Sequence, residues 1–184
     1  MAVPIPKMTV EEYLAADEVA ERPLEYHDGE VFPAFDATPA HSRLSVKLAR
    51  ALDQRLEGSG CTTYGALRVR VSPVQYLYPD VAVVCGQLAL TSEKDSSVSN
   101  PNVVFEILSP STHDYDYGAK FKLYRQLESL EEDVLLSREG TQVEVFRRAP
   151  GNWTLFTFEG PDATLVLESL QIQIPLNELY AQLP

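Results

Sequence analysis

The sequence predicts an α/β or α+β fold in which helices flank a mixed central β-sheet, with a hairpin near the N-terminus and further strands at the C-terminus. Apolar residues recur at helical spacing over 40–57, which indicates an amphipathic helix. Two short segments, 80–85 and 102–108, are almost continuously apolar, as buried strands are. Strands of this kind need cover on both faces of their sheet, which the predicted helices can supply.

Size and charge narrow the class of protein. A chain of 184 residues, 45% hydrophobic and 23% charged, predicts one globular domain over 1–184 and excludes a disordered or collagen-like chain. The net charge of −12 opposes the binding of nucleic acid by the bulk surface, so such a role needs a local basic strip or an oligomer that concentrates one. The N-terminus does not resemble a signal peptide and no apolar run approaches about 18 residues, which predicts a cytoplasmic protein without a membrane partner.

The first half of the chain carries clear local signals. Thr9 and Glu12 form a capping box, which predicts a short helix that extends to about Glu18. The pair Asp28-Gly29 predicts the tight turn of a hairpin. The elements expected here are the hairpin over 24–32, the helix over 40–57 ended by Gly58 and Gly60, strands over 66–71, 80–85 and 102–108, and loops over 73–79 and 86–101.

The second half of the chain is expected to be rich in strands. Glu139-Gly140 predicts the turn of a second hairpin. Trp153 and Phe156, on an expected strand, hint at a contact surface. The elements expected here are a helix over 116–130, strands over 134–136, 142–147 and 153–158, a strand-like segment over 165–174, and a terminal helix over 176–183.

The two cysteines offer no recognisable metal or redox motif. Cys61 and Cys85 lie in different apolar stretches and lack the spacing of a zinc knuckle or of a redox pair. A single pair is also too few for a disulfide scaffold. We therefore expect two buried free thiols.

Two carboxylates, Asp80 and Glu106, lie in segments that are otherwise apolar and are predicted to be buried strands. Asp80 follows Pro79 at the start of one strand, and Glu106 lies inside the next. Burying an ionised carboxylate without a partner costs several kcal/mol. Glu106 must therefore face solvent, pair with a cation such as Arg68 or Arg70, or bind a metal ion. Asp80 has a simpler alternative as the cap of a turn.

If these two strands are neighbours, the carboxylates of Asp80 and Glu106 can stand about 5 Å apart. Carboxylates this close repel each other unless a cation lies between them. Mg²⁺ suits such a site, because it takes oxygen ligands and often uses only one or two protein carboxylates. Lys120, in the following helix, is then a candidate to orient or deprotonate an attacking water, unless it is a solvated helix residue. Lys122 is the alternative, and Arg125 lies one turn beyond Lys120.

A set of short motifs occurs in order along the chain. In that order they are Met8-Thr-Val-Glu-Glu-Tyr-Leu14, Leu24-Glu-Tyr-His-Asp-Gly-Glu30, His41, Pro79-Asp80, Phe105-Glu-Ile-Leu-Ser-Pro-Ser111 and Asp116-Tyr-Gly-Ala-Lys-Phe-Lys-Leu-Tyr124. The combination, which extends from Met8 to about Leu179, resembles the Uma family of restriction-endonuclease-like proteins in the PD-(D/E)XK nuclease superfamily. The resemblance implies a mixed central sheet flanked by helices, with a metal site on its strands.

The resemblance also implies roles for individual residues. Asp80 matches the Asp of the PD motif and Glu106 matches the acidic residue of the second motif, so both are expected to bind metal and to be catalytic. The superfamily usually places a Lys two residues after that Glu, where this chain has Leu108. The resemblance assigns the catalytic Lys to the following helix instead, at Lys120. The chain departs from the family over 127–137, which lacks the usual aromatic pair and Asp.

Further residues are candidates for this site. Glu25 and Glu30 match acidic positions of the family's N-terminal hairpin, and the resemblance leaves open which of them completes the metal shell. His41 matches a commonly present His. We take Glu30, His41 and Lys122 as possible additional site residues.

The expected function is that of a metal-dependent endonuclease, with Mg²⁺ or Mn²⁺ supporting the hydrolysis of phosphodiester bonds in DNA. Arg43, Lys47 and Arg50 follow one face of the helix over 40–57 and offer a basic strip for a phosphate backbone, unless they are a solvated helix face. Related nucleases commonly dimerise, which suggests a homodimer. Two alternatives stay open, a non-catalytic binding or regulatory module of the same fold and a metal-assisted hydrolase of a small anionic substrate.

Overall fold

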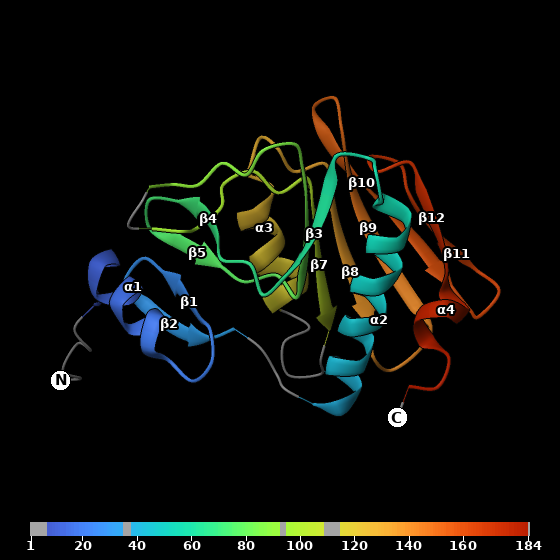
Figure 1. Ribbon diagram of the computed structural model, residues 1–184, viewed down its shortest axis with the longest axis horizontal. Helices are drawn as coiled ribbons and strands as arrows, with labels where there is room; N and C mark the ends of the chain where they lie inside the picture. The colour runs from blue at the N-terminus through green and yellow to red at the C-terminus, as the bar shows by residue number, and fades with distance from the viewer. Residues whose placement is uncertain (1–6, 35–37, 93–94, 109–114, 184) are drawn as a thin grey trace.

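The computed structural model describes residues 7–34, 38–92, 95–108 and 115–183, which form three β-sheets and several helices (Figure 1). The helices are α1 (Val10–Val19), α2 (Pro39–Leu56), the π-helical turn η1 (Tyr115–Lys120), α3 (Phe121–Tyr124) and α4 (Leu176–Tyr180). The strands are β1 (Leu24–His27), β2 (Glu30–Pro33), β3 (Cys61–Gly65), β4 (Val69–Ser72), β5 (Gln75–Leu77), β6 (Val81–Cys85), β7 (Val103–Leu108), β8 (Glu132–Ser137), β9 (Gln142–Ala149), β10 (Asn152–Glu159), β11 (Thr164–Leu167) and β12 (Ile172–Pro175). Within the described ranges, no helix is both long and apolar enough to cross a lipid bilayer.

The central element is a six-stranded mixed sheet with the strand order β10-β9-β8-β7-β6-β3. β7 and β8 run parallel, and every other neighbouring pair in this sheet is antiparallel. All six residues of β7 are buried, which confirms the strand that its apolar sequence predicts. The predicted fold class, a mixed sheet flanked by helices, is confirmed.

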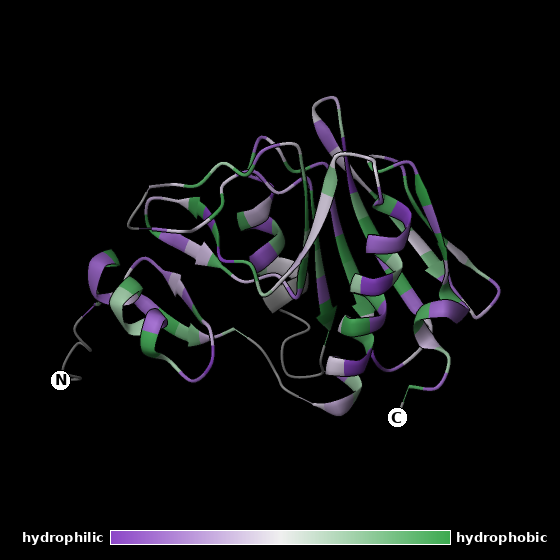
Figure 2. Ribbon diagram, viewed as in Figure 1, coloured by the Kyte–Doolittle hydropathy of each residue, from purple (hydrophilic) through white to green (hydrophobic). Residues whose placement is uncertain are grey.

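α2 packs on one face of this sheet because its apolar residues recur at helical spacing and are buried. These residues give green bands along the ribbon of α2 in Figure 2. Leu44 and Leu48 are fully buried in a core cluster that also contains Phe105 of β7. The next residue toward the N-terminus, Val104, faces the other way and joins a second cluster with Tyr124 of α3. Successive residues of β7 therefore face α2 and α3 in turn, as the alternation of a strand requires.

A second sheet, with the strand order β2-β1-β5-β4, stands beside the central one and carries α1 (Figure 1). Its core is a cluster of Tyr13, Tyr26 and Tyr76, in which the ring centroids of Tyr13 and Tyr26 lie 4.9 Å apart. Arg68, just before β4, donates to the Asp17 carboxylate of α1 at 2.6 Å. The aromatic cluster and this ion pair hold α1 against the sheet.

Several local predictions are confirmed. α1 begins with the capping box of Thr9 and Glu12. The β1–β2 hairpin turns through positive φ angles of 46° at Asp28 and 97° at Gly29, which a two-residue turn of this kind requires. β10 contains the whole of the strand expected over 153–158.

The structure differs from the predictions where strands are short. The sequence predicts no strand at β3, and β5 lies inside the loop expected over 73–79. The segment expected as one strand over 165–174 is instead the antiparallel pair of β11 and β12. Segments of three to five residues show too little alternation to be recognised without their partner strands.

The helix expected over 116–130 is also shorter, because α3 ends at Tyr124. Arg148, on β9, donates to the carbonyl oxygens of Leu127 and Leu130, each at 2.6 Å. Those carbonyls are therefore satisfied without helical hydrogen bonds. The residue that supplies these bonds lies in a distant strand, so the local sequence does not reveal it.

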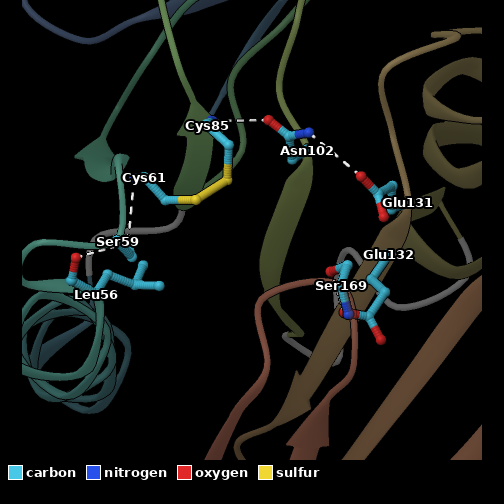
Figure 3. Close-up of a disulfide and its surroundings, with 8 residues drawn as sticks. All are labelled: Leu56, Ser59, Cys61, Cys85, Asn102, Glu131, Glu132 and Ser169. Carbon is cyan, nitrogen blue, oxygen red and sulfur yellow. Dashed lines mark hydrogen bonds between the residues drawn. A yellow bond between two sulfur atoms is a disulfide. The ribbon is translucent and has the colours of Figure 1, made fainter.

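Cys61 and Cys85 form a disulfide (Figure 3), so the prediction of buried free thiols is wrong. The two residues lie opposite each other in the register of β3 and β6, and both are half-buried. The carboxamide oxygen of Asn102 accepts a hydrogen bond from the Cys85 backbone N–H at 2.7 Å, which fixes the end of β6. The sequence gives no sign of this pairing because it predicts no strand at β3.

The disulfide closes a loop between residues separated by 24 positions, so it should restrict the unfolded chain. We predict that replacing both cysteines with Ser lowers the free energy of unfolding by about 3 kcal/mol. Urea denaturation of the two proteins without reductant measures this difference. Reduced wild-type protein is the control and should match the double variant. Two reactive thiols per unfolded, unreduced chain would contradict the prediction.

Candidate active site

Asp80 and Glu106 lie at the same end of two neighbouring strands. β6 and β7 are antiparallel with Val81 opposite Phe105, so the same register continued by one residue puts Asp80 opposite Glu106. Opposite residues of an antiparallel pair point to the same face of the sheet. Both side chains are buried, because Asp80 is 7% exposed and Glu106 is 3% exposed. The condition on which the predicted metal site depends, that the two strands are neighbours, is therefore met.

Glu106 meets a cation from the segment that follows its strand. The Nζ atom of Lys120 lies 3.1 Å from Glu106 Oε1, and the hydroxyl of Tyr124 donates to the same oxygen at 2.9 Å. Lys120 ends η1 and Tyr124 ends α3 one turn later, so both side chains reach the same side of the helix. Glu106 therefore does not face solvent, and it pairs with Lys120 instead of Arg68, which binds Asp17. Its role as a metal ligand stays a prediction.

Tyr124 keeps its proton in this setting. Burial, and next the negative charge of Glu106, raise the pKa of Tyr124 well above its usual 10.0. The hydroxyl therefore remains a donor to the Glu106 carboxylate at any physiological pH. The hydrogen bond holds that carboxylate in a defined orientation.

Glu25 brings a second carboxylate to the same lysine. It comes from β1 of the second sheet, is 1% exposed, and its Oε1 atom lies 3.0 Å from Lys120 Nζ. The backbone N–H of Tyr78 donates to the same oxygen at 3.0 Å. Burial acts to raise the pKa of Glu25, but the charge of Lys120 and the hydrogen bonds from His27 and Tyr78 outweigh it and hold that pKa below its usual 4.5. Lys120 thus joins one carboxylate from each sheet.

Asp80 is fixed at both carboxylate oxygens. The backbone N–H of Ile107 donates to Oδ2 at 2.7 Å, and the Nε2 atom of His41 lies 2.9 Å from Oδ1. His41 is in the first turn of α2, where the side chain of Thr38 accepts its backbone N–H. The start of α2 therefore brings the predicted His41 to the predicted Asp80.

The cluster has more negative than positive charge. The described residues include the buried carboxylates of Glu25, Asp80 and Glu106 and one buried ammonium group, that of Lys120, which contacts Glu25 and Glu106. In the part of the chain that the structure describes, no three His, Cys, Asp or Glu side chains form a ready-made metal-binding group. Mg²⁺ does not need one, because it is commonly bound by one or two carboxylates together with water and substrate phosphates. The oxygen donors of Asp80 and Glu106 and the excess negative charge therefore suit a hard divalent cation.

Comparison with known proteins shows the family to which the chain belongs. Residues 10–177 match the sequence profile of the Uma2 family, described as "Putative restriction endonuclease". The chain belongs to the Uma2 family. Two uncharacterized proteins of Synechocystis sp. are similar to it: slr1290 is 30% identical over 97% of this chain and 94% of its own length, and sll1609 is 28% identical over 90% and 95%.

A solved structure resembles this Uma2 chain over almost its whole length. It is the crystal structure from Anabaena variabilis described as "a putative nuclease belonging to DUF820", with a TM-score of 0.77 and 18% identity over 96% of this chain and 99% of that one. At this level of identity the likeness concerns the fold. The Uma2 chain therefore has the restriction-endonuclease-like fold that the sequence resemblance implies.

The Uma2 structure does not bring every candidate to the cluster. Glu30 is the first residue of the edge strand β2 and is exposed. Glu25 lies on the inner strand β1 and is buried. Lys122 is exposed as well, because it is two residues from Lys120 and so faces away from it on the helix. Of the two hairpin carboxylates left open by the sequence, Glu25 is the one at the site.

The basic strip of α2 is only partly available. Arg43 and Arg50 are exposed, but Lys47 is half-buried and its Nζ atom donates to the carbonyl oxygens of Glu178, at 3.1 Å, and Ala181 at the end of α4. Lys47 therefore caps a helix rather than presenting its charge to solvent. The role of this strip in binding nucleic acid stays a prediction that rests on Arg43 and Arg50.

Sequence reasoning missed Tyr124 as a member of the Uma2 site. Its position four residues after Lys120 was a usable signal, because residues at that spacing share a helix face. Tyr124 therefore lies near Glu106, the carboxylate that Lys120 contacts. A buried tyrosine hydroxyl also needs a hydrogen-bond acceptor, which Glu106 supplies.

The central position of Lys120 leads to a stability prediction. Replacing Lys120 with Met leaves Glu25 and Glu106 buried without that positive charge, which should lower the free energy of unfolding at pH 7 by about 3 kcal/mol. The pKa of Glu25 is below its usual 4.5 in the folded wild type, so its stabilising contribution is present above 4.5 and is lost as the pH falls through the folded pKa. The difference between wild type and variant should therefore shrink as the pH falls below 4.5.

Urea denaturation of both proteins at pH 7 and at about pH 4 measures this difference. The matched control is Lys122→Met, which removes an exposed lysine of the same helical segment and should change stability by less than about 0.5 kcal/mol. An equal loss in the two variants, or a loss for Lys120→Met that does not depend on pH, would show that the ion pairs do not stabilise the fold.

Proposed function

We propose that this Uma2 protein is a metal-dependent endonuclease that hydrolyses phosphodiester bonds in DNA. The observation that carries the proposal is the buried pair of Asp80 and Glu106 on neighbouring strands, with Lys120 Nζ 3.1 Å from Glu106. The family description supports a nuclease, and the carboxylate oxygens suit a divalent cation.

Asp80 and Glu106 would hold Mg²⁺, or Mn²⁺ in its place. A metal ion in such a site polarises the scissile phosphate and lowers the pKa of a bound water. The protein's part is to present both carboxylates in fixed positions. Ile107 and His41 hold the two oxygens of Asp80, and Tyr124 holds Glu106.

Lys120 supplies the positive charge next to these ligands. Its ammonium group can donate a hydrogen bond to the attacking water or to a phosphate oxygen, and it offsets negative charge that develops on the phosphate. Glu25 is a positioning residue in this scheme. Its Oε1 atom lies 3.0 Å from Lys120 Nζ, so it would keep the lysine at the site when Glu106 binds a metal ion.

Cleavage of both strands of a duplex requires two such sites. In the described residues each chain contains one cluster of this composition, built from Glu25, Asp80, Glu106 and Lys120. We therefore expect one chain to nick DNA and a pair of chains to be needed for a double-strand break.

A second candidate is a metal-assisted hydrolase of a small anionic substrate. The net charge of −12 and the engagement of Lys47 with α4 favour it, because a small substrate needs no broad basic surface. Such an enzyme would use the same carboxylates and the same lysine.

The test is nicking of a supercoiled plasmid at low salt with Mg²⁺, with Mn²⁺ or with EDTA. Wild-type protein should cleave only with a metal ion, and Asp80→Asn or Glu106→Gln should reduce the rate by about 100-fold or more. The control is Glu30→Gln, which alters an exposed carboxylate and should leave the rate unchanged.

Cleavage that survives both Asp80→Asn and Glu106→Gln would overturn the assignment of the site. No cleavage of DNA by a folded wild-type protein, together with metal-dependent hydrolysis of a small phosphodiester, would favour the second candidate. No hydrolysis of either substrate would favour a non-catalytic module.

A further inference from the structure

We propose that a surface of aromatic and arginine side chains between α3 and β10 binds an unpaired strand of DNA, so that the substrate class of the carboxylate cluster is DNA with single-stranded segments. This stacking surface consists of the side chains of Phe121, Arg125, Phe146, Arg148 and Trp153. The inference rests on the proposed function, because it names the form of DNA that the nuclease would take.

The stacking surface lies on the same face of the central sheet as the carboxylate cluster. Trp153 stands opposite Arg148 of β9 and packs against the core cluster that contains Val104 and Tyr124. Val104 is two residues before Glu106 on β7, so the two side chains face the same way. The hydroxyl of Tyr124 donates to Glu106. One layer of side chains therefore extends from the cluster to Trp153.

The spacing along this face suits a single strand of nucleic acid. β10 is three strands from β7, and Thr157 is the residue of β10 that is level with Glu106. Trp153 lies four residues from Thr157. With about 4.8 Å between strands and about 3.3 Å per residue, about 20 Å separates Glu106 from Trp153 along the sheet. A strand whose scissile phosphate lies at Glu106 would therefore reach Trp153 with a base a few nucleotides away.

The aromatic part of the surface is held in place by ring contacts. The rings of Phe121 and Phe146 stack with their centroids 4.1 Å apart, and the ring of Trp153 is perpendicular to that of Phe121 at 5.5 Å. All three side chains are half-buried, so each keeps some exposed area. Phe121 directly follows Lys120, which places the start of the stacking surface beside the lysine of the cluster. Fixed aromatic rings of this kind are the surfaces on which unpaired bases stack.

Two arginines give the stacking surface a positive charge in an otherwise acidic chain. Arg125 and Arg148 are exposed, and their Cζ atoms lie 5.9 Å from the ring centroid of Phe121 and 4.5 Å from that of Trp153. Across the described ranges, neither arginine forms an ion pair with a carboxylate. Arg148 is also fixed, because its Nη2 atom donates to the carbonyl oxygen of Leu127 at 2.6 Å. Both charges are therefore available to a phosphate beside the rings.

The stacking surface continues into an open cavity at the β9–β10 turn. The cavity has a volume of about 830 Å³, and Arg148, Trp153, Asn152, Ser169 and Glu131 are among its lining residues. Pockets of this size hold small organic groups and orient them through a few polar side chains. The carboxylate of Glu131 opposes a phosphate there, but it can accept a hydrogen bond from the amino group of a base. An uncharged base is therefore the part of the strand that suits the cavity.

The composition of the surface favours an unpaired strand over a duplex. Binding of a duplex through its backbone depends on many contacts between cations and phosphates. The stacking surface has only two arginines, in a chain with a net charge of −12. The faces of the bases are covered by their neighbours inside a duplex and are accessible in a single strand. Stacking adds affinity for an accessible base without requiring further cations.

The fluorescence of the wild-type protein tests this surface directly, because Trp153 is the only tryptophan of the chain. A single-stranded oligonucleotide of about 20 nucleotides and mixed sequence should quench this fluorescence at low salt in EDTA, where the metal-dependent reaction is absent. The blunt duplex of the same sequence should bind about 10-fold more weakly, because its bases are stacked on one another.

Variants locate the binding when the anisotropy of a labelled single strand is measured. Trp153→Ala should weaken binding about 10-fold, and Trp153→Phe should retain most of the affinity because it keeps a ring. The matched control is Phe156→Ala, which should bind like the wild type. Phe156 belongs to the same strand and also lies against an arginine, with Arg147 Cζ 4.5 Å from its ring centroid, but it is on the other face of the sheet. Arg147 is neutralised there by Glu132 and Glu168.

The absence of quenching by the single strand, equal binding of the duplex, or equal losses in Trp153→Ala and Phe156→Ala would overturn the proposal. The quenching result needs no variant, so it decides the matter even if Trp153→Ala fails to fold. Quenching by the single strand without cleavage of any DNA in Mg²⁺ or Mn²⁺ would support the stacking surface and overturn the proposed nuclease. Metal-dependent nicking that Asp80→Asn removes, without quenching, would overturn the stacking surface and leave the proposed function standing.

Discussion

The fold of this protein depends on one buried lysine that is shared between two carboxylates. Lys120 contacts Glu25 of the second sheet at 3.0 Å and Glu106 of the central sheet at 3.1 Å, so the relative position of the two sheets is tied to its charge. Burying three charged groups costs several kcal/mol each, and a well-packed apolar contact would stabilise the same junction at least as well. Stability alone therefore does not explain why the chain keeps charged groups at this junction.

The parts of this arrangement that the sequence predicts are those with strong local signals. The apolar runs of β6 and β7 predict buried strands, and a carboxylate in such a run already indicates a partner or a ligand. The local sequence does not show which of the two hairpin carboxylates, Glu25 or Glu30, lies at the site. That choice depends on β1 being an inner strand, and β1 is an inner strand only because it pairs with β5, which the sequence presents as part of a loop.

Contacts between distant segments also explain two further differences from the predictions, the disulfide and the early end of α3. The disulfide depends on the register of β3 against β6, and the early end of α3 depends on Arg148 of β9 reaching carbonyl oxygens beyond Tyr124. Both are contacts between segments far apart in the chain, which no window of local sequence contains. The contacts of Glu106 with Lys120, at the end of η1, and with Tyr124, at the end of α3, are likewise contacts between different elements.

The acidic character of the chain, at first an objection to a role with DNA, also bears on how the site would work. A net charge of −12 and a cluster in which Glu25, Asp80 and Glu106 outnumber Lys120 repel a phosphate as long as the cluster holds no further cation. A bound divalent ion would neutralise that local excess, so the binding of an anionic substrate at this site would depend on the binding of a metal ion. With few basic side chains to contact the backbone elsewhere, affinity for DNA should also fall only slowly with salt, because few counterions are released. An acidic nuclease of this design would thus derive its hold on the phosphate backbone of DNA mainly from the metal ion at the scissile phosphate.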